Sequence, residues 1–340
     1  MTFFAICSPK PVNMTYPIID THCDLLSYLA KVQGAAPDSR DIPCGLPYLK
    51  EGNVKMQVLA IYTDVRPESM DIAYRQVGEF KALLENHKEE VCLADRGFLA
   101  TIEQQKKIGL VCAIENAAGL ANETAKWSDI YQLLDKIIAD TGRLAYISLT
   151  HHTENRFGGG NYTDVGLKDD GRKLLDYIDG KKIAIDLSHT SDLLAEGILE
   201  HLTTNSLDIP VIASHSNFRT IWDHKRNITD EFAKEIIHRK GIVGVNFLRA
   251  FLDDATPERL FDHIKHGFAI GAEDCICFGA DFFYTKDFPD KSRHPFYFPL
   301  AENASNYPSL MESLSNDLPD MQLQKLAYKN CQRFFKETWV

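Results

Sequence analysis

The stretch IAIDLSHT at residues 183–190 runs from apolar residues into Ser188-His189, and VIASHS at residues 211–216 repeats that order. Between them, residues 191–201 show the apolar spacing of a helix. Short apolar runs that do not alternate with polar residues are typical of strands buried on both faces of a parallel sheet. The two stretches therefore predict a strand–helix–strand unit with a histidine at the end of each strand.

Similar apolar runs recur along the chain. The predicted strands are 18–21, 56–62, 109–114, 144–149, 183–187, 211–214, 242–247 and 275–279. Helical spacing falls between them, at 74–90, 128–140, 170–178, 191–201, 229–238 and 257–269. About eight repeats of strand and helix predict an α/β fold, a single (β/α)₈ TIM-like barrel domain over residues 1–340. A doubly wound open sheet is the rival fold, and the strand count and the length of 340 residues favour the barrel.

The chain closes with a long irregular stretch and a helical tail. Residues 282–307 are rich in Pro, Asp, Phe and Tyr and follow the last predicted strand. This loop is either a surface insertion or a wall of a pocket at the barrel mouth, and the wall is favoured because long loops in compact domains often carry function. The residues after it predict C-terminal helices.

Composition excludes some classes of protein. The formal net charge is −11 and no cluster of Lys and Arg stands out, so binding to nucleic acid is not expected. No apolar run reaches the roughly 18 residues of a membrane span. The N-terminal MTFFAICSPK lacks the basic start of a signal peptide, and the eight cysteines form no CxxC pair. We therefore expect buried free thiols and a cytoplasmic protein.

Polar side chains follow the ends of the predicted strands, where barrels build their active sites. In chain order they are His22, Asp24, Glu115, His151, His152, His189, His215 and Asp281. A single histidine or glutamate in such a place is more often hydrogen-bonded structure, a salt bridge or a helix cap. Together, imidazoles and carboxylates suit zinc or a similar divalent ion. By strand alternation, His152 is expected to turn away from His151.

A set of short motifs adds to this pattern. They are DTHCDLL from Asp20, SLTHHTEN from Ser148, IDLSHTS from Ile185, VIASHSN from Val211, KRN from Lys225 and FGADF from Phe278, with Glu115 between the first two. In order and spacing the set resembles the renal (membrane) dipeptidase family, zinc metallopeptidases built on an amidohydrolase-like barrel. The resemblance spans most of the chain, from Asp20 to Asp281.

The resemblance implies a centre of two zinc ions. His22 and Asp24 would bind one ion, His189 and His215 would bind the other, and Glu115 would bridge them. A hydroxide between the two ions would then attack the peptide bond.

The resemblance also implies contacts with a small peptide substrate. His151 would contact the substrate and the developing oxyanion, and Asn155 fits the same substrate-binding motif. Arg226 would hold the terminal carboxylate, for which its planar fork is suited. Asp281 would move the proton. Similar enzymes accept a D-residue at the C-terminal position and are often dimers, so the resemblance allows both here.

Some residues depart from the family pattern. Asn116-Ala117 stands where members often have a glycine pair, and Phe282-Phe283 follows Asp281 in place of Phe-Asp-Gly. These changes leave the substrate open, so an amidohydrolase for N-acyl amino acids, lactams or lactones is the alternative, and an inactive binding barrel is the second. The H-x-D pair and Glu115 favour the dipeptidase.

Overall fold

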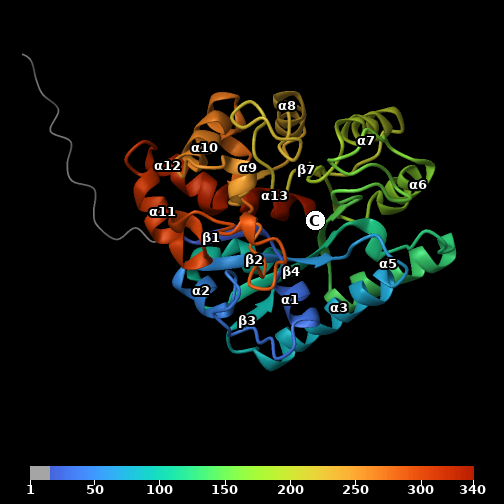
Figure 1. The fold of residues 1–340 in the computed structure, drawn as a ribbon, viewed down its shortest axis with the longest axis horizontal. Helices are drawn as coiled ribbons and strands as arrows, with labels where there is room; N and C mark the ends of the chain where they lie inside the picture. The colour runs from blue at the N-terminus through green and yellow to red at the C-terminus, as the bar shows by residue number, and fades with distance from the viewer. Residues whose placement is uncertain (1–15) are drawn as a thin grey trace, which may run out of the picture.

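The computed structural model describes residues 16–340, in which parallel strands are surrounded by helices (Figure 1). The strands pair in the order β7-β6-β5-β4-β2-β1-β9-β8. Their bounds are β1 Ile18–Cys23, β2 Val54–Tyr62, β4 Ile108–Glu115, β5 Leu144–Ser148, β6 Ala184–Asp186, β7 Val211–Ile212, β8 Val243–Val245 and β9 Ile276–Phe278. Each of the eight predicted strands has a counterpart in this order.

The two ends of the sheet meet just past β7. Ala213 forms a parallel bridge with Val243, and the amide of Gly244 donates to the carbonyl of Ala213 at 2.8 Å. The amide of Ser216 donates in turn to the carbonyl of Gly244 at 2.7 Å. The sheet is therefore a nearly closed barrel, and the predicted (β/α)₈ fold is confirmed.

Helices form the outer layer. Those along the first half of the chain are α1 Leu25–Lys31, α2 Leu46–Glu51, α3 Ser69–Asn86, α4 Arg96–Ala100, α5 Trp127–Thr141 and α6 Asp169–Ile178. Those of the second half are α7 Asp192–Thr204, α8 Asp230–His238, α9 Arg249–Leu252, α10 Arg259–Ala269, α11 Tyr307–Leu314, α12 Asp320–Gln324 and α13 Asn330–Thr338, with a π-helix at Lys325–Lys329. Helices α3 and α5 lie across the barrel from α8 and α10 (Figure 1).

One strand was not predicted. β3, Val91–Leu93, pairs with β4 outside the main order of strands. Three residues are too few to show a strand period, and charged residues precede them. The short helices α1, α2 and α4 were also not predicted, because five to seven residues are too few to show a clear helical period.

Strand register brings the functional ends of the strands to one level. Tyr62 pairs with Glu115, Glu115 with Ser148, and Ser148 with Asp186. All strands are parallel, so these carboxyl ends form one rim.

The loop after β9 folds back over this rim. Leu248 bridges Tyr297, the amide of Arg249 donates to the carbonyl of Phe296 at 2.9 Å, and the Tyr297 hydroxyl donates to the carbonyl of Asp281 at 2.6 Å. The loop is therefore fastened at the barrel mouth.

Two sequence predictions concern thiols and membranes. The seven cysteines within residues 16–340 are free, and all but Cys92 are buried, as predicted. Over the same residues, no helix is both long enough and apolar enough to cross a bilayer. Cys7 and the N-terminal MTFFAICSPK lie outside the described residues.

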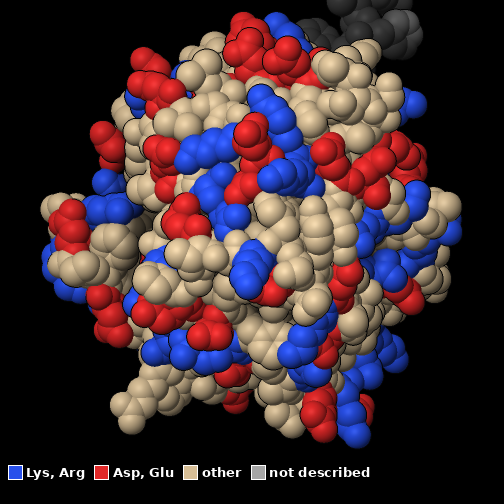
Figure 2. All heavy atoms as spheres, turned by 90° about the vertical axis from the view of Figure 1, so that its right-hand side faces the viewer, with Lys and Arg blue, Asp and Glu red and all other residues tan. Residues whose placement is uncertain are grey.

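On the face in Figure 2, basic and acidic side chains are interspersed, so that face carries no field of a single sign.

Candidate active site

Glu115, the last residue of β4, lies at the centre of the rim and presents its two oxygens to different histidines. Oε2 lies 3.4 Å from Nε2 of His22. Oε1 lies 3.1 Å from Nε2 of His189 and 3.5 Å from Nε2 of His215. A carboxylate between two groups of ligands in this way is suited to bridge two cations.

One side of Glu115 is formed by the end of β1. Nε2 of His22 lies 4.0 Å from Oδ2 of Asp24 and 3.7 Å from Oδ1 of Asp281, which follows β9. His22 and Asp24 are two residues apart and face the same side, as strand alternation predicts. The predicted pairing of these two side chains is thus present.

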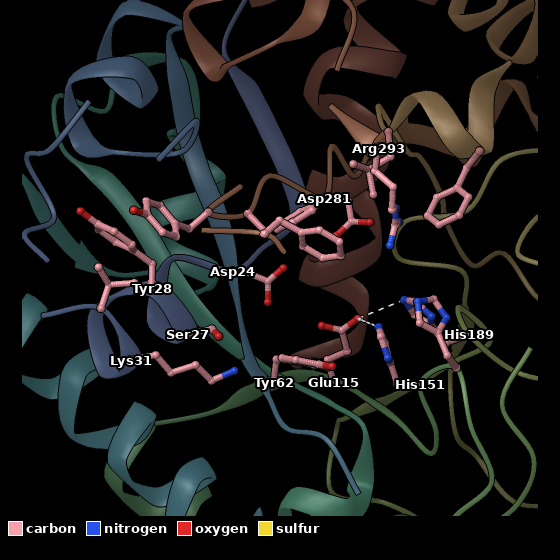
Figure 3. Close-up of a pocket in the computed structure, with 17 residues that line it drawn as sticks. Asp24, Ser27, Tyr28, Lys31, Tyr62, Glu115, His151, His189, Asp281 and Arg293 are labelled. Carbon is pink, nitrogen blue, oxygen red and sulfur yellow. Dashed lines mark ion pairs between the residues drawn. The ribbon is translucent and has the colours of Figure 1, made fainter. Parts of the chain in front are cut away.

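The other side is formed by the ends of β6 and β7. The Nε2 atoms of His189 and His215 lie 3.0 Å apart, and both face Glu115. His215 also stacks on His22, with ring centroids 3.6 Å apart. The structure therefore brings all five predicted metal ligands together (Figure 3 labels three of them, Asp24, Glu115 and His189).

Hydrogen bonds at Nδ1 orient the histidine rings. Nδ1 of His22 lies 2.7 Å from the hydroxyl of Tyr146, which itself donates to the carbonyl of Thr21 at 2.9 Å. The hydroxyl proton is used on Thr21, so Nδ1 of His22 carries the hydrogen and its Nε2 carries the lone pair.

His215 and His189 follow the same arrangement. Nδ1 of His215 lies 2.6 Å from Oγ of Ser214, which donates to Oδ2 of Asp186 at 2.6 Å. Nδ1 of His189 lies 3.3 Å from Oδ1 of Asn161, an atom that can only accept. All three rings therefore direct an Nε2 lone pair toward the centre of the site.

The donor set fits divalent cations. Among the described residues, Nε2 of His22 and Oδ1 of Asp24 are buried polar atoms with no hydrogen-bond partner. Burial raises the pKa of Glu115 to about 8 and holds the pKa values of His189 and His215 well below their usual range. Neutral imidazoles and desolvated carboxylates are the ligands that zinc takes, and a cation would offset the cost of burying them.

Three residues of the rim have left-handed backbone. Asn116, His189 and Asp281 have φ values of 71°, 67° and 61°. Such conformations are uncommon for residues other than glycine and cluster at functional sites. At Asn116, asparagine tolerates this conformation better than most residues.

Asp281 is held with one oxygen engaged and one available. Oδ2 accepts a hydrogen bond from Nδ2 of Asn246 at 2.8 Å, whereas Oδ1 faces His22. Burial raises the pKa of Asp281 to about 6. A carboxyl with this pKa can exchange a proton near neutral pH.

His151 and His152 both line the cavity. Nε2 of His151 lies 3.8 Å from Oε1 of Glu115. The ring centroids of His151 and His152 lie 3.9 Å apart. The prediction that His152 turns away is wrong, because both residues follow the end of β5 in a bend where strand alternation no longer applies. Nδ1 of His152 lies 3.0 Å from Oδ1 of Asn161.

Arg226 is buried beside the site. Two of its N–H groups donate to Oγ of Ser216 and to the carbonyl of His215, both at 2.9 Å, and it is not among the residues that line the cavity. Its predicted contact with a substrate carboxylate stays a prediction.

Asn155 is buried in the loop after β5. Its Nδ2 donates to Oδ1 of Asn116 and to the carbonyl of Leu149, and its Oδ1 accepts from the amides of Phe157 and Gly158. The amide group is used in bracing the loop after β5, and Asn155 does not line the cavity. Asn155 therefore braces this loop, and its predicted contact with the substrate stays a prediction.

The cavity above the centre has a volume of about 400 Å³ (Figure 3). Its walls come from the strand ends, from α1 and from the loop after β9. The lining residues are Asp24, Ser27, Tyr28, Lys31, Val32, Tyr62, Glu115, His151, His152, His189, Leu248, Phe251, Asp281, Phe283, Tyr284, Phe288 and Arg293. The last four confirm the prediction that residues 282–307 form a pocket wall.

Sequence reasoning missed the residues that hold the ligands in place, namely Tyr146, Asn161, Ser214 and Asn246. Asn246 directly follows β8, so the rule that found the other strand-end residues could have found it. Tyr146 lies inside β5 and gave no such signal, because an apolar strand accommodates tyrosine equally well.

Comparisons with known proteins point to one family of peptidases. The family model for membrane dipeptidases, peptidase family M19, matches residues 8–339. A protein from the 5′ region of pqqA in Klebsiella pneumoniae is 26% identical over 290 residues, which cover 80% of this chain and 98% of that protein. An uncharacterised dipeptidase of Schizosaccharomyces pombe is 23% identical over 358 residues, which cover 95% of this chain and 81% of that protein.

Solved structures share the fold. The metallopeptidase dipeptidase AC has a TM-score of 0.80 at 20% identity and covers 96% of this chain and 99% of its own. A metallopeptidase from Rhodobacter sphaeroides, liganded with a phosphinate mimic of the dipeptide L-Ala-D-Ala, has a TM-score of 0.81 at 19% identity and covers 96% of this chain and 100% of its own. Because the family model spans nearly the whole chain, this protein belongs to the membrane dipeptidase family of metallopeptidases.

Proposed function

We propose that this protein is a zinc-dependent dipeptidase that hydrolyses the peptide bond of dipeptides, including those with a D-residue at the C-terminal position. The observation that carries the proposal is Glu115, whose two oxygens face separate sets of ligands. Family membership supports a dipeptidase, and the Rhodobacter structure with its L-Ala-D-Ala mimic motivates the D-residue.

His22 and Asp24 would hold one ion and His189 and His215 the other, with Glu115 between them. When bound, two divalent ions supply the positive charge that polarises a carbonyl and lowers the pKa of water. The hydrogen bonds at Nδ1 of His22, His189 and His215 leave the Nε2 lone pair of each ring available for such an ion.

Asp281 would move the proton. Asn246 engages Oδ2, so Oδ1 is the oxygen that can take a proton and deliver it to the leaving amine. Burial and the neighbouring His152 hold the pKa of His151 well below its usual range, so its ring is neutral and can donate one N–H to the carbonyl oxygen as negative charge develops.

Metal analysis and peptide assays on one sample test the proposal. The purified protein is analysed for metal by plasma mass spectrometry and assayed against L-L and L-D dipeptides and their C-terminal amides. About two zinc ions per chain with hydrolysis of dipeptides support it. A zinc-loaded protein that spares every peptide but cleaves N-acyl amino acids, lactams or lactones would move the function to that class.

Two further sequence predictions belong to this proposal. We place the enzyme in the cytoplasm on the basis of its free cysteines, and we propose a homodimer by analogy with similar enzymes. Fractionation of the source cells and light scattering of the purified chain test them separately.

A further inference from the structure

Two side chains of the cavity wall carry permanent positive charge, Lys31 from the end of α1 and Arg293 from the loop after β9. Within residues 16–340, neither side chain makes an ion pair or a hydrogen bond; their contacts are with aromatic rings. A cation that lines a cavity without a partner is free to bind an anion there.

Arg293 is held in place by aromatic rings. Its guanidinium carbon lies 4.8 Å from the ring centroid of Phe288 and 5.2 Å from that of Phe296. The ring centroids of Phe288 and Phe296 lie 4.9 Å apart, and those of Phe283 and Phe296 lie 5.1 Å apart. The cluster fixes the guanidinium at the cavity, on the side of Asp281 and His189 (Figure 3). Less conformational freedom then remains to be lost when a ligand binds.

Lys31 differs from Arg293 in the number of rings that contact it and in the shape of its charged group. Its ammonium lies 4.9 Å from the ring centroid of Tyr62 and has no second ring against it. An ammonium is a point charge on a flexible stem, whereas a guanidinium matches a carboxylate with two parallel N–H groups. Arg226 has the right chemistry, but it does not line the cavity, and two of its N–H groups already donate to Ser216 and to the carbonyl of His215.

We propose that Arg293 binds a carboxylate of the substrate and so determines specificity from the loop after β9. The inference rests on the proposed dipeptidase function and names a recognition residue for it. In a dipeptide the carboxylate has two sources, the C-terminus and an acidic side chain, and both present the same planar group to the guanidinium.

Paired substrates separate the two sources. Zinc-loaded wild type, Arg293→Gln, Arg293→Lys and the control Lys31→Gln are assayed with Ala-Ala and its C-terminal amide, and with Ala-Glu and Ala-Gln. We expect wild type to prefer the anionic member of at least one pair by about tenfold, the size of one charge-assisted hydrogen bond. Arg293→Gln removes that preference by raising KM of the anionic member, Arg293→Lys restores part of it, and Lys31→Gln keeps it.

The pattern of losses identifies the source. Loss of the acid-over-amide preference identifies the C-terminal carboxylate, and loss of the Glu-over-Gln preference identifies the side chain. Unchanged preferences in Arg293→Gln overturn the proposal, as does an equal loss in Lys31→Gln, which would reveal a general field instead of a binding group.

Calorimetry separates this proposal from the proposed function. The same peptides are titrated into zinc-loaded Asp281→Asn, with and without Arg293→Gln. Peptides that wild type does not cleave, but whose binding depends on Arg293, overturn the dipeptidase and retain the carboxylate site. Peptides that neither bind nor react overturn both.

Discussion

The half of the cavity that carries the proposed metal ligands and the half proposed to meet the substrate are built differently. His22, Glu115 and His215 stand at the ends of buried strands, and their positions follow from strand register. The substrate side comes from loops, with Arg293 held by aromatic contacts, and Asn155 braces one of these loops from outside the cavity. Barrel strands thus hold the reactive groups rigidly, while loops are free to change what the cavity accepts.

The largest effect is expected at Glu115. Glu115→Gln removes the carboxylate that faces both sets of ligands, and we expect a loss of activity of about a thousandfold or more, as for removal of a central electrostatic group. Metal content should fall below that of wild type, measured by plasma mass spectrometry after dialysis. Glu258→Gln, a change at an exposed glutamate, should alter neither. Full metal content with wild-type activity would show that the centre is not organised around Glu115.

A smaller effect is expected where a strand residue orients a ligand. Tyr146→Phe keeps the ring and removes the hydroxyl that accepts from Nδ1 of His22. Loss of such a partner weakens metal affinity by about 10- to 100-fold. Competition with a chelator measures the metal affinity. The matched control is Tyr177→Phe, which removes a hydroxyl that binds Asp135 on the surface. Equal affinities in the two variants would remove Tyr146 from the metal centre.

The loop half predicts a change in stability instead. Asn155→Ala removes the acceptor of the Phe157 and Gly158 amides, and each buried group left unpaired in this way costs about 1–3 kcal/mol. We expect a lower Tm by calorimetry with KM for dipeptides changed less than about threefold. A large rise in KM at an unchanged Tm would instead support the substrate contact that the sequence predicted.

The same division decides what the sequence could predict. The strand ends were predictable because a buried apolar run ends where a histidine or carboxylate begins, and parallel strands bring those ends together. His152 was misplaced because the strand period was extended past Ser148 into a bend. Arg293 gave no signal of its own within the predicted pocket wall of residues 282–307, since its place depends on Phe288 and Phe296, which meet it only in the folded loop.

The smallest expected effect is a pH dependence of the metal-free protein that tests the burial of Glu115. Its pKa is about 8 in the folded protein and about 4.3 in an unfolded chain. The folded state therefore keeps a proton that the unfolded state has lost, and the contribution of Glu115 to stability falls as pH rises from 6.5 to 8, by up to about 1.4 kcal/mol per pH unit. His189 and His215, whose folded pKa values are depressed, are about half protonated in the unfolded chain at pH 6.5, so they offset part of this slope at pH 6.5 and little of it at pH 8.

Denaturant unfolding of the metal-free protein at pH 6.5, 7.25 and 8 measures this slope, and Glu115→Gln is its own control because the amide does not titrate. We expect the stability of the variant to fall less with rising pH than that of wild type, because the histidine contributions are common to both proteins. An equal slope in both proteins would mean that Glu115 is already ionised in the metal-free fold. The strand end would then solvate the carboxylate by itself, and the rigid half of the cavity would not depend on a cation for its charge balance.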